Sequence, residues 1–168
     1  ADTMTTRHII SLLLENEAGA LSRVAGLFSA RGFNIETLTV APTHDATLSR
    51  MTIVTSGTEA IIEQINKQLN KLVDVVQVKD ITEGEHIERE LVMIKISTAG
   101  LDCDQVRQII TEHEADVVDQ QDDTCVIELL GNSEKINTLI AAMAQYPLLE
   151  VVRSGVSGIA RGAEVLSI

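Results

Sequence analysis

Apolar and polar residues alternate with two periodicities along the first half of the chain, one of two residues and one of three to four residues. The longer period predicts a helix over 20–31, with Gly32 where a left-handed C-cap belongs, and a second helix after residue 60. The apolar stripes are Leu21, Val24, Ala25 and Phe28 in the first helix and Ile61, Ile65, Leu69 and Leu72 in the second. Alternating or β-branched segments predict strands over 7–15, 33–40, 48–55 and 73–81. The predicted order is βαββαβ.

The second half of the chain repeats this order. Strands are predicted over 91–97, 115–121, 124–131 and 149–153, with a turn at Asp122 and Asp123 joining the middle two. Helical stripes consist of Val106, Ile109, Ile110 and His113 and, further on, of Ile136, Leu139, Ile140 and Met143. Asp102 with Gln105 resembles a capping box at the start of one helix, and Pro147 ends the other.

A duplicated βαββαβ unit predicts an α+β fold made of two tandem ferredoxin-like domains. We assign residues 1–6 to a flexible N-terminus or tag remnant, residues 7–81 to the first domain and residues 82–168 to the second. In each domain both helices would cover one face of a four-stranded antiparallel sheet. The other face is then expected to be covered by a second copy of the chain or by a catalytic partner.

Composition and charge narrow the class of protein. The net charge is −12, and residues 82–168 carry sixteen acidic but only six basic side chains. An acidic chain with two Phe, one Tyr and no Trp offers neither phosphate contacts nor a stacking platform, so nucleic-acid binding is disfavoured. No apolar run approaches the roughly 20 residues of a membrane span, and no signal peptide is recognisable. Cys103 and Cys125 have no metal or redox spacing, so we expect a cytoplasmic protein in which Cys125 is a small buried residue.

The sequence carries no catalytic signature. It lacks the GxSxG elbow, the P-loop, HExxH and a GxGxxG that follows a strand. The four histidines have no metal-ligand spacing, and His113 is interpreted as a helix-end residue. The acidic group Glu83, Glu85, Glu88 and Glu90 is interpreted as solvated surface and not as a cation site.

One segment has the features of a binding site, the run from Asn16 to Leu21 between the first strand and the first helix. A loop that opens a helix presents free backbone N–H groups at the positive end of the helix dipole, which suit a ligand carboxylate. Gly19 permits an unusual backbone angle or a close approach. The alternative is that Asn16 is an ordinary turn or N-cap residue and Gly19 a conformational convenience.

Three runs in the first unit carry a resemblance to a known family: LLLENEAGALSRVAGLFSARGFNIETLTVAPT, LSRMTIVTSG and QLNKLVDVVQV. They resemble the small, regulatory subunits of bacterial acetolactate (acetohydroxyacid) synthase, and the first unit thereby resembles an ACT domain. The family's C-terminal domain is resembled by ERELVMIKI and VVRSGVSGIARG. The resemblance implies a chain that is not catalytic alone. Such a chain activates a separate catalytic subunit of branched-chain amino-acid biosynthesis and confers feedback inhibition by valine or a related amino acid.

The resemblance also implies ligands and partners. Thiamine diphosphate, FAD and a divalent cation are expected on the catalytic subunit, with no cofactor or metal in this chain, and the chain is expected to form a homodimer through its ACT domains. The residues expected to bind the effector are Asn16, Glu17, Ala18, Gly19, Ala20 and Leu21 of one protomer with Asn34 and Ile35 of the other. The positions Thr39, Ala41 and Gln64 are associated with the response to the effector.

Three other functions stay open on the sequence. The chain could be an amino-acid-sensing ACT regulator of a different metabolic enzyme. It could be an enzyme on the same scaffold, although the missing acid, base and nucleophile argue against this. RNA-recognition modules share the βαββαβ order, but they display aromatic residues on the central strands, where this chain has only Phe33.

Overall fold

The computed structural model describes residues 4–167. Of the predicted N-terminal segment 1–6, residues 1–3 lie outside the described residues. The first strand already begins at Thr6, one residue before the predicted start. The predicted α+β fold of two tandem ferredoxin-like units is confirmed, with two antiparallel sheets that each carry two helices.

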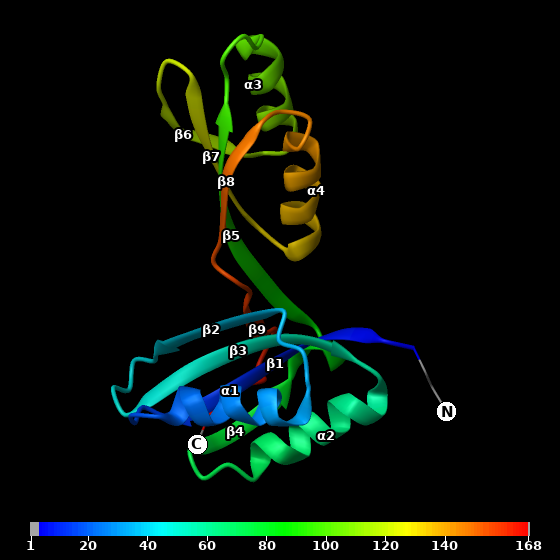
Figure 1. The fold of residues 1–168 in the computed structure, drawn as a ribbon. Coiled ribbons are helices and arrows are strands. Elements are labelled where there is room, and N and C mark those ends of the chain that lie inside the picture. Colours follow the sequence, from blue (N-terminus) through cyan, green and yellow to red (C-terminus); the bar gives the residue numbers. More distant parts are fainter. Residues whose placement is uncertain (1–3, 168) are drawn as a thin grey trace. The chain divides into compact units, whose positions relative to one another are not determined.

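The first unit is a four-stranded sheet in the order β2-β3-β1-β4. Figure 1 shows α1 and α2 together on one face of this sheet. The elements are β1 (Thr6–Glu15), α1 (Ala20–Arg31), β2 (Thr37–Pro42), β3 (Leu48–Gly57), α2 (Glu59–Asn70) and β4 (Val75–Asp80), followed by the short 3-10 helix η1 (Ile81–Glu83). The period of two in β1 divides its side chains between the faces, and Ile10, Leu12 and Leu14 pack under the helices.

Two positions of the predicted helical stripes lie on the surface. Leu21 is 44% exposed and Ile61 is 37% exposed. In α2 the neighbouring Ile62 is buried in place of Ile61, together with Ile65 and Leu69. Adjacent residues on a helix point about 100° apart. The sequence pattern therefore did not decide which of two neighbouring isoleucines faces the core.

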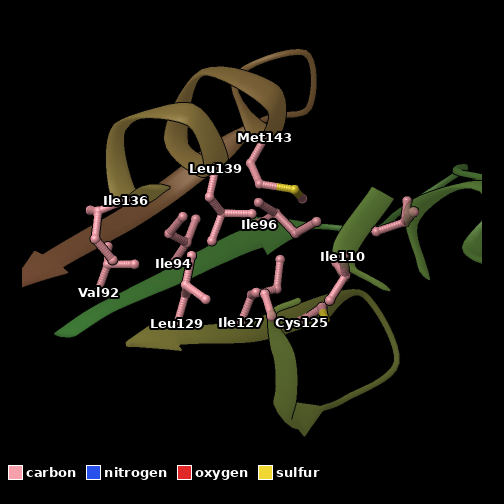
Figure 2. Packing of buried hydrophobic residues seen from close by; sticks show 12 residues of the cluster. Val92, Ile94, Ile96, Ile110, Cys125, Ile127, Leu129, Ile136, Leu139 and Met143 are labelled. Atoms are coloured by element: carbon pink, nitrogen blue, oxygen red, sulfur yellow. The ribbon is translucent and has the colours of Figure 1, made fainter. Parts of the chain in front are cut away.

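The second unit has the same architecture, with the strand order β6-β7-β5-β8. Its elements are β5 (His86–Ser97), α3 (Cys103–Glu112), β6 (Asp116–Gln120), β7 (Thr124–Gly131), α4 (Ser133–Met143) and β8 (Leu148–Arg153). Figure 2 shows its core, in which alternate residues of β5 and β7 meet the apolar side of α4. Cys125 lies in this core, as predicted, and burial raises the pKa of its thiol.

Local capping explains where most helices begin and end. Side chains of Thr58, Asp102 and Asn132 accept hydrogen bonds from the first-turn amides of α2, α3 and α4. Gly32 ends α1 in the left-handed conformation, with φ at 67°, as predicted. His113 is the C-cap of α3, and its Nδ1 lies 2.8 Å from the carbonyl oxygen of Ile109, so its interpretation as a helix-end residue is confirmed.

The last part of the chain belongs to the first compact unit, which also includes the first residues of β5. The strand β9 (Ser157–Ala160) pairs with β5, and the chain from Val156 onward clusters with the residues up to Ile87. The second compact unit is Glu88–Gly155. The compact units therefore do not coincide with the predicted sequence ranges 7–81 and 82–168. The difference arises because the C-terminal segment returns to the first sheet.

One acidic residue interpreted as solvated is buried instead. Glu90 is 1% exposed, and its Oε1 accepts a hydrogen bond of 2.7 Å from Nε of Arg153. Its Oε2 has no partner among the described residues. The surface interpretation of Glu90 was therefore wrong, whereas Glu83 and Glu85 are exposed as expected. A partner that is 63 residues away in the sequence allows the carboxylate to be buried.

Candidate functional site

The loop between β1 and α1 borders a groove with a volume of about 250 Å³. Four residues of the predicted effector loop line it, and so does Ala41 at the end of β2. The lining consists of Leu14, Glu15, Asn16, Glu17, Ala20, Leu21, Val40, Ala41, Pro42 and Ser49. The lining of the groove thus combines aliphatic side chains with carboxylate and amide groups.

Asn16 ties this loop to the connection between β2 and β3. Its backbone N–H donates to the carbonyl of Thr47 at 2.8 Å, and its side-chain Nδ2 donates to the carbonyl of Ala46 at 3.0 Å. Asn16 is not the N-cap of α1, because that position belongs to Gly19. The side-chain amide holds the groove in shape, and its oxygen is left as an acceptor.

Gly19 is required by the backbone at the start of α1. It has φ +87°, in the left-handed region that residues with a Cβ seldom adopt. A Cβ at this position would also lie 2.9 Å from Nη1 of Arg23. No side chain caps the first turn of α1, in contrast to the other three α-helices of the described chain. The N–H of Ala20 donates to the carbonyl of Glu17 at 3.3 Å, and the amides of Leu21 and Ser22 are left available to a ligand oxygen.

The charges beside the groove are mainly negative. Carboxylate oxygens of Glu15, Glu17 and Asp74 lie within 4.8 Å of one another. Arg23 forms an ion pair with Asp74, and its Nη2 reaches the carbonyl of Ala18 at 3.4 Å. The hydrogen bond between the side chains of Arg23 and Asp74 lowers the pKa of Asp74 and raises that of Arg23. Arg23 also interacts electrostatically with Glu17, but one cation faces three carboxylates, so the cluster still favours a cationic group.

The other residues predicted for the effector site lie elsewhere in the chain. Asn34 and Ile35 follow the C-terminal end of α1, whose 12 residues span about 18 Å. The carbonyl of Asn34 accepts a hydrogen bond from Thr55, and Ile35 packs against the first core. They therefore do not join the loop within one chain. A shared site would need these residues from a second copy, as the resemblance implies.

Thr39 and Gln64 do not line the groove. The hydroxyl of Thr39 donates to the carbonyl of Val156 at 3.1 Å, on the face of the first sheet opposite the helices. Gln64 is exposed on α2. Sequence reasoning missed Val40, Pro42 and Ser49, which line the groove because β2 pairs with β3 in a register that sets Pro42 opposite Ser49. The predicted hairpin was the only signal that could have placed them there.

A second arrangement bears on the alternative of an enzyme. Nε2 of His8 lies 2.8 Å from Oγ1 of Thr6, and its Nδ1 lies 2.5 Å from Oδ2 of Asp80, an order also found in acyl-transfer triads. The adjoining cavity of about 480 Å³ is lined by Glu59, Glu63 and Glu83. An oxyanion needs N–H donors, and three carboxylates would oppose its charge. This arrangement therefore does not support acyl transfer.

Comparison with known proteins shows the family of the chain. Residues 10–77 match the family model described as the AHAS small subunit-like ACT domain, and residues 89–162 match the one described as the small subunit of acetolactate synthase. The first unit is an ACT domain, and the chain is thus of the class of ACT-domain regulatory proteins. It belongs to the family of acetolactate synthase small subunits. A member of this family is a regulatory subunit and is not catalytic alone.

Individual relatives cover nearly the whole chain. The acetolactate synthase isozyme 3 small subunit of Escherichia coli is 48% identical over 95% of this chain and 99% of its own length. The acetolactate synthase small subunit of Haemophilus influenzae is 50% identical over 93% of this chain and 96% of its own. The crystal structure of the small subunit from Thermotoga maritima, at 32% identity, superimposes with a TM-score of 0.82 over 95% of this chain and 99% of its own.

Proposed function

We propose that this chain activates a separate catalytic subunit of acetolactate synthase and makes it sensitive to a branched-chain amino acid, such as valine, bound in the groove beside α1. The observation that carries the proposal is the combination of uncapped helix amides, neighbouring carboxylates and aliphatic lining residues at one groove. No helix among the described residues is long and apolar enough to span a bilayer. We place the chain in the cytoplasm with the catalytic subunit.

The groove offers complementary partners to each part of an amino-acid zwitterion. The carboxylate would accept hydrogen bonds from the first-turn amides of α1. The ammonium would lie toward Glu17 and the oxygen of the Asn16 side chain, both of which are acceptors. The aliphatic side chain would contact Leu21 and Val40. A volume of about 250 Å³ is below the roughly 300–1,000 Å³ of sites for larger ligands, which favours a small amino acid.

A second protomer would complete the site. Leu21 and Val40 are both exposed in the single chain, so apolar surface beside the groove is left uncovered. Asn34 and Ile35 of the second protomer would close the groove and add further polar and apolar contacts. A ligand held by two protomers couples its binding to their arrangement, and it can shift the attached catalytic subunit only by its difference in affinity for two arrangements.

The proposal assigns the chemistry of the reaction to the partner. Thiamine diphosphate, FAD and a divalent cation would be bound by the catalytic subunit, and this chain would contribute activation and inhibition. Acetolactate formation by the catalytic subunit is therefore measured with and without the chain, and with and without valine. A rise on addition of the chain, reversed by valine, is expected. If the chain changes neither the rate nor the valine response, the proposal fails.

Calorimetric titration of the full chain with valine locates the site. The Asn16→Ala variant loses the hydrogen bond to Ala46 that shapes the groove, so its affinity for valine should fall about tenfold or more. Asn70→Ala is the matched control. Asn70 is an exposed asparagine that also donates to a backbone carbonyl, that of Asn66, at the end of α2. Equal affinities of the Asn16 variant and the wild type would exclude the groove as the valine site.

A further inference from the structure

Residues 156–160, which we name the C-terminal strap, lie on the face of the first sheet opposite its helices. Backbone groups of the strap are held by side chains of β2 and β3. The hydroxyl of Thr39 donates to the carbonyl of Val156 at 3.1 Å, and the N–H of Val156 donates to Oγ1 of Thr37 at 3.4 Å. Nη2 of Arg50 donates to the carbonyl of Gly158 at 3.0 Å and to Oγ of Ser11 at 3.3 Å.

Apolar packing fixes the strap at two points. Val156 is buried in a cluster with Ile9, Val54 and Ile81. At Gly158 the strap comes so close to the sheet that an added Cβ would lie 2.6 Å from Cδ1 of Ile81 and 3.4 Å from Cγ2 of Ile9. Both neighbours are buried, so neither can move away cheaply. Gly158 is therefore needed for lack of space and not for its backbone angle.

The chain continues from the strap along the same unit as far as β4. The N–H of Arg161 donates to the carbonyl of Glu85 at 2.9 Å, and Glu164 forms an ion pair of 2.7 Å with Lys79. The N–H of Ser167 donates to Oε1 of Gln77 at 2.9 Å. These contacts, together with those of the strap, tie residues 156–167 to all four strands of the first sheet.

The end of β2 forms a wall common to the strap and the effector groove. A cavity of about 440 Å³ lies between β2, β3 and the strap, lined by Thr39, Arg50 and residues 157–159 among others. Val40, Ala41 and Pro42 line this cavity and also the groove of about 250 Å³ beside α1. A ligand in the groove therefore touches the segment of β2 that directly follows Thr39.

We infer that the strap responds to occupancy of the effector groove, because a ligand seated against Val40–Pro42 stabilises the position of β2 in which Thr39 holds the carbonyl of Val156. This inference rests on the proposed function. Occupancy of the groove and docking of the strap then favour each other, and each strengthens the other by the same factor. The strap begins three residues after β8 ends at Arg153, so a short connection joins it to the second unit.

Hydrogen exchange of the full-length wild type with and without valine tests the inference directly. Saturating valine should slow exchange at the amides of Val156 and Arg161 by about fivefold or more, the usual lower range of coupling between sites. The exchange rates of amides in the core of the second unit provide the internal reference. Strap amides that exchange at the same rate with and without bound valine would overturn the inference while leaving the proposed function intact.

Two pairs of variants separate coupling from loss of structure. Thr39→Val keeps the shape but loses the hydroxyl donor, whereas Thr39→Ser keeps the donor. Gly158→Ala inserts the excluded methyl group, whereas Ser157→Ala changes an exposed neighbour in the strap. Thr39→Val and Gly158→Ala should weaken valine binding, and inhibition of the catalytic subunit, about fivefold to tenfold. Thr39→Ser and Ser157→Ala should resemble the wild type.

The outcomes distinguish the two proposals. If Gly158→Ala does not fold, Thr39→Val decides the question, because Val is nearly isosteric with Thr. Wild-type affinity and inhibition in Thr39→Val would overturn the coupling. A wild type that neither binds valine nor confers inhibition would overturn the proposed function, and the inference with it.

Discussion

Arg23 on α1 and Asp74 before β4 form an ion pair next to the loop that lines the groove. Asp74 is almost fully buried, with 4% of its side chain exposed, whereas the side chain of Arg23 is 47% exposed. The carbonyl of Asp74 also accepts a hydrogen bond of 2.8 Å from the N–H of Glu15. The same two residues therefore fix both ends of the loop that leads from β1 into α1.

Acid should weaken the ion pair between Arg23 and Asp74, and the Asp74→Asn variant should show how much of the acid dependence of stability comes from it. The hydrogen bond from Arg23 lowers the pKa of Asp74 in the folded chain. A lowered folded pKa gives stability that is present above the unfolded value of about 3.9 and is lost as the pH falls through the folded value. In urea denaturation between pH 7 and pH 3, the wild type should therefore lose more stability below about pH 4 than Asp74→Asn does.

Glu63 provides the comparison for that experiment. It forms an ion pair of 2.9 Å with Lys67, which also lowers its pKa, but both side chains are exposed on α2. Solvent screens such a pair, so Glu63→Gln should follow the wild-type curve closely. Parallel curves for the wild type and Asp74→Asn would show that the pair with Arg23 contributes nothing.

Gly19→Ala should destabilise the first unit and distort the loop that lines the groove. An alanine would be held at φ +87°, which costs about 1–2 kcal/mol in the left-handed region. Its Cβ would also displace the guanidinium of Arg23. We expect a loss of at least about 1 kcal/mol in the free energy of unfolding, measured in urea, and weaker valine binding.

Gly26→Ala is the matched control, since Gly26 lies in the same helix and has nothing within 4 Å of the added Cβ. It should stabilise α1 by about 0.5–1 kcal/mol, because alanine is the better helix former. The strain argument for Gly19 would be wrong if both alanine variants stabilised the chain.

Local features of the fold could be predicted from the sequence. The period of the apolar residues gave both βαββαβ units, and Gly32 and Asp102 were placed at the helix ends where the structure has them. These features depend on residues within a few positions of each other. The loop at Gly19 was selected for the same reason, because a strand, a turn and a helix follow one another directly.

Features that depend on distant partners were not predictable. Glu90 has the sequence context of a surface residue, and only Arg153 allows its burial. The strap was not foreseen, since Val156 becomes a core residue only when the chain returns to Ile9 and Ile81. Pro42 and Ser49 joined the groove through the register of β2 and β3. Sequence periodicity carries none of this information.

Substitutions on the two faces of β7 should differ in their effect on the stability of the second unit. Ile127 is fully buried in the core between the sheet and its helices (Figure 2). Leu130 on the same strand is 61% exposed. Ile127→Ala should cost about 2–5 kcal/mol, and Ile127→Val about 0.5–1.5 kcal/mol. Leu130→Ala should change stability by no more than about 0.5 kcal/mol. Near-UV circular dichroism during denaturation is not suited to so few aromatic residues, so hydrogen exchange of core amides is the measurement. Equal losses for Ile127→Ala and Leu130→Ala would contradict the assigned faces.

The buried carboxylate of Glu90 should make Arg153 important for the stability of the second unit. Removing the guanidinium in Arg153→Ala leaves a charge that is out of contact with water, since Glu90 has no exposed side-chain surface. We expect a loss of about 3 kcal/mol, because the variant loses a charge-assisted bond and keeps the desolvation of the carboxylate. Arg89→Ala is the control, because Arg89 is exposed and its Nη1 donates to the carbonyl of Glu88.

A double variant, Glu90→Leu with Arg153→Leu, tests the physical cause. It removes both charges, so no carboxylate is left buried and most of the lost stability should return. Hydrogen exchange of the β5 amides reports on all three variants. If the double variant were as unstable as Arg153→Ala, the loss would come from the packing of the arginine stem against the sheet and not from an uncompensated charge.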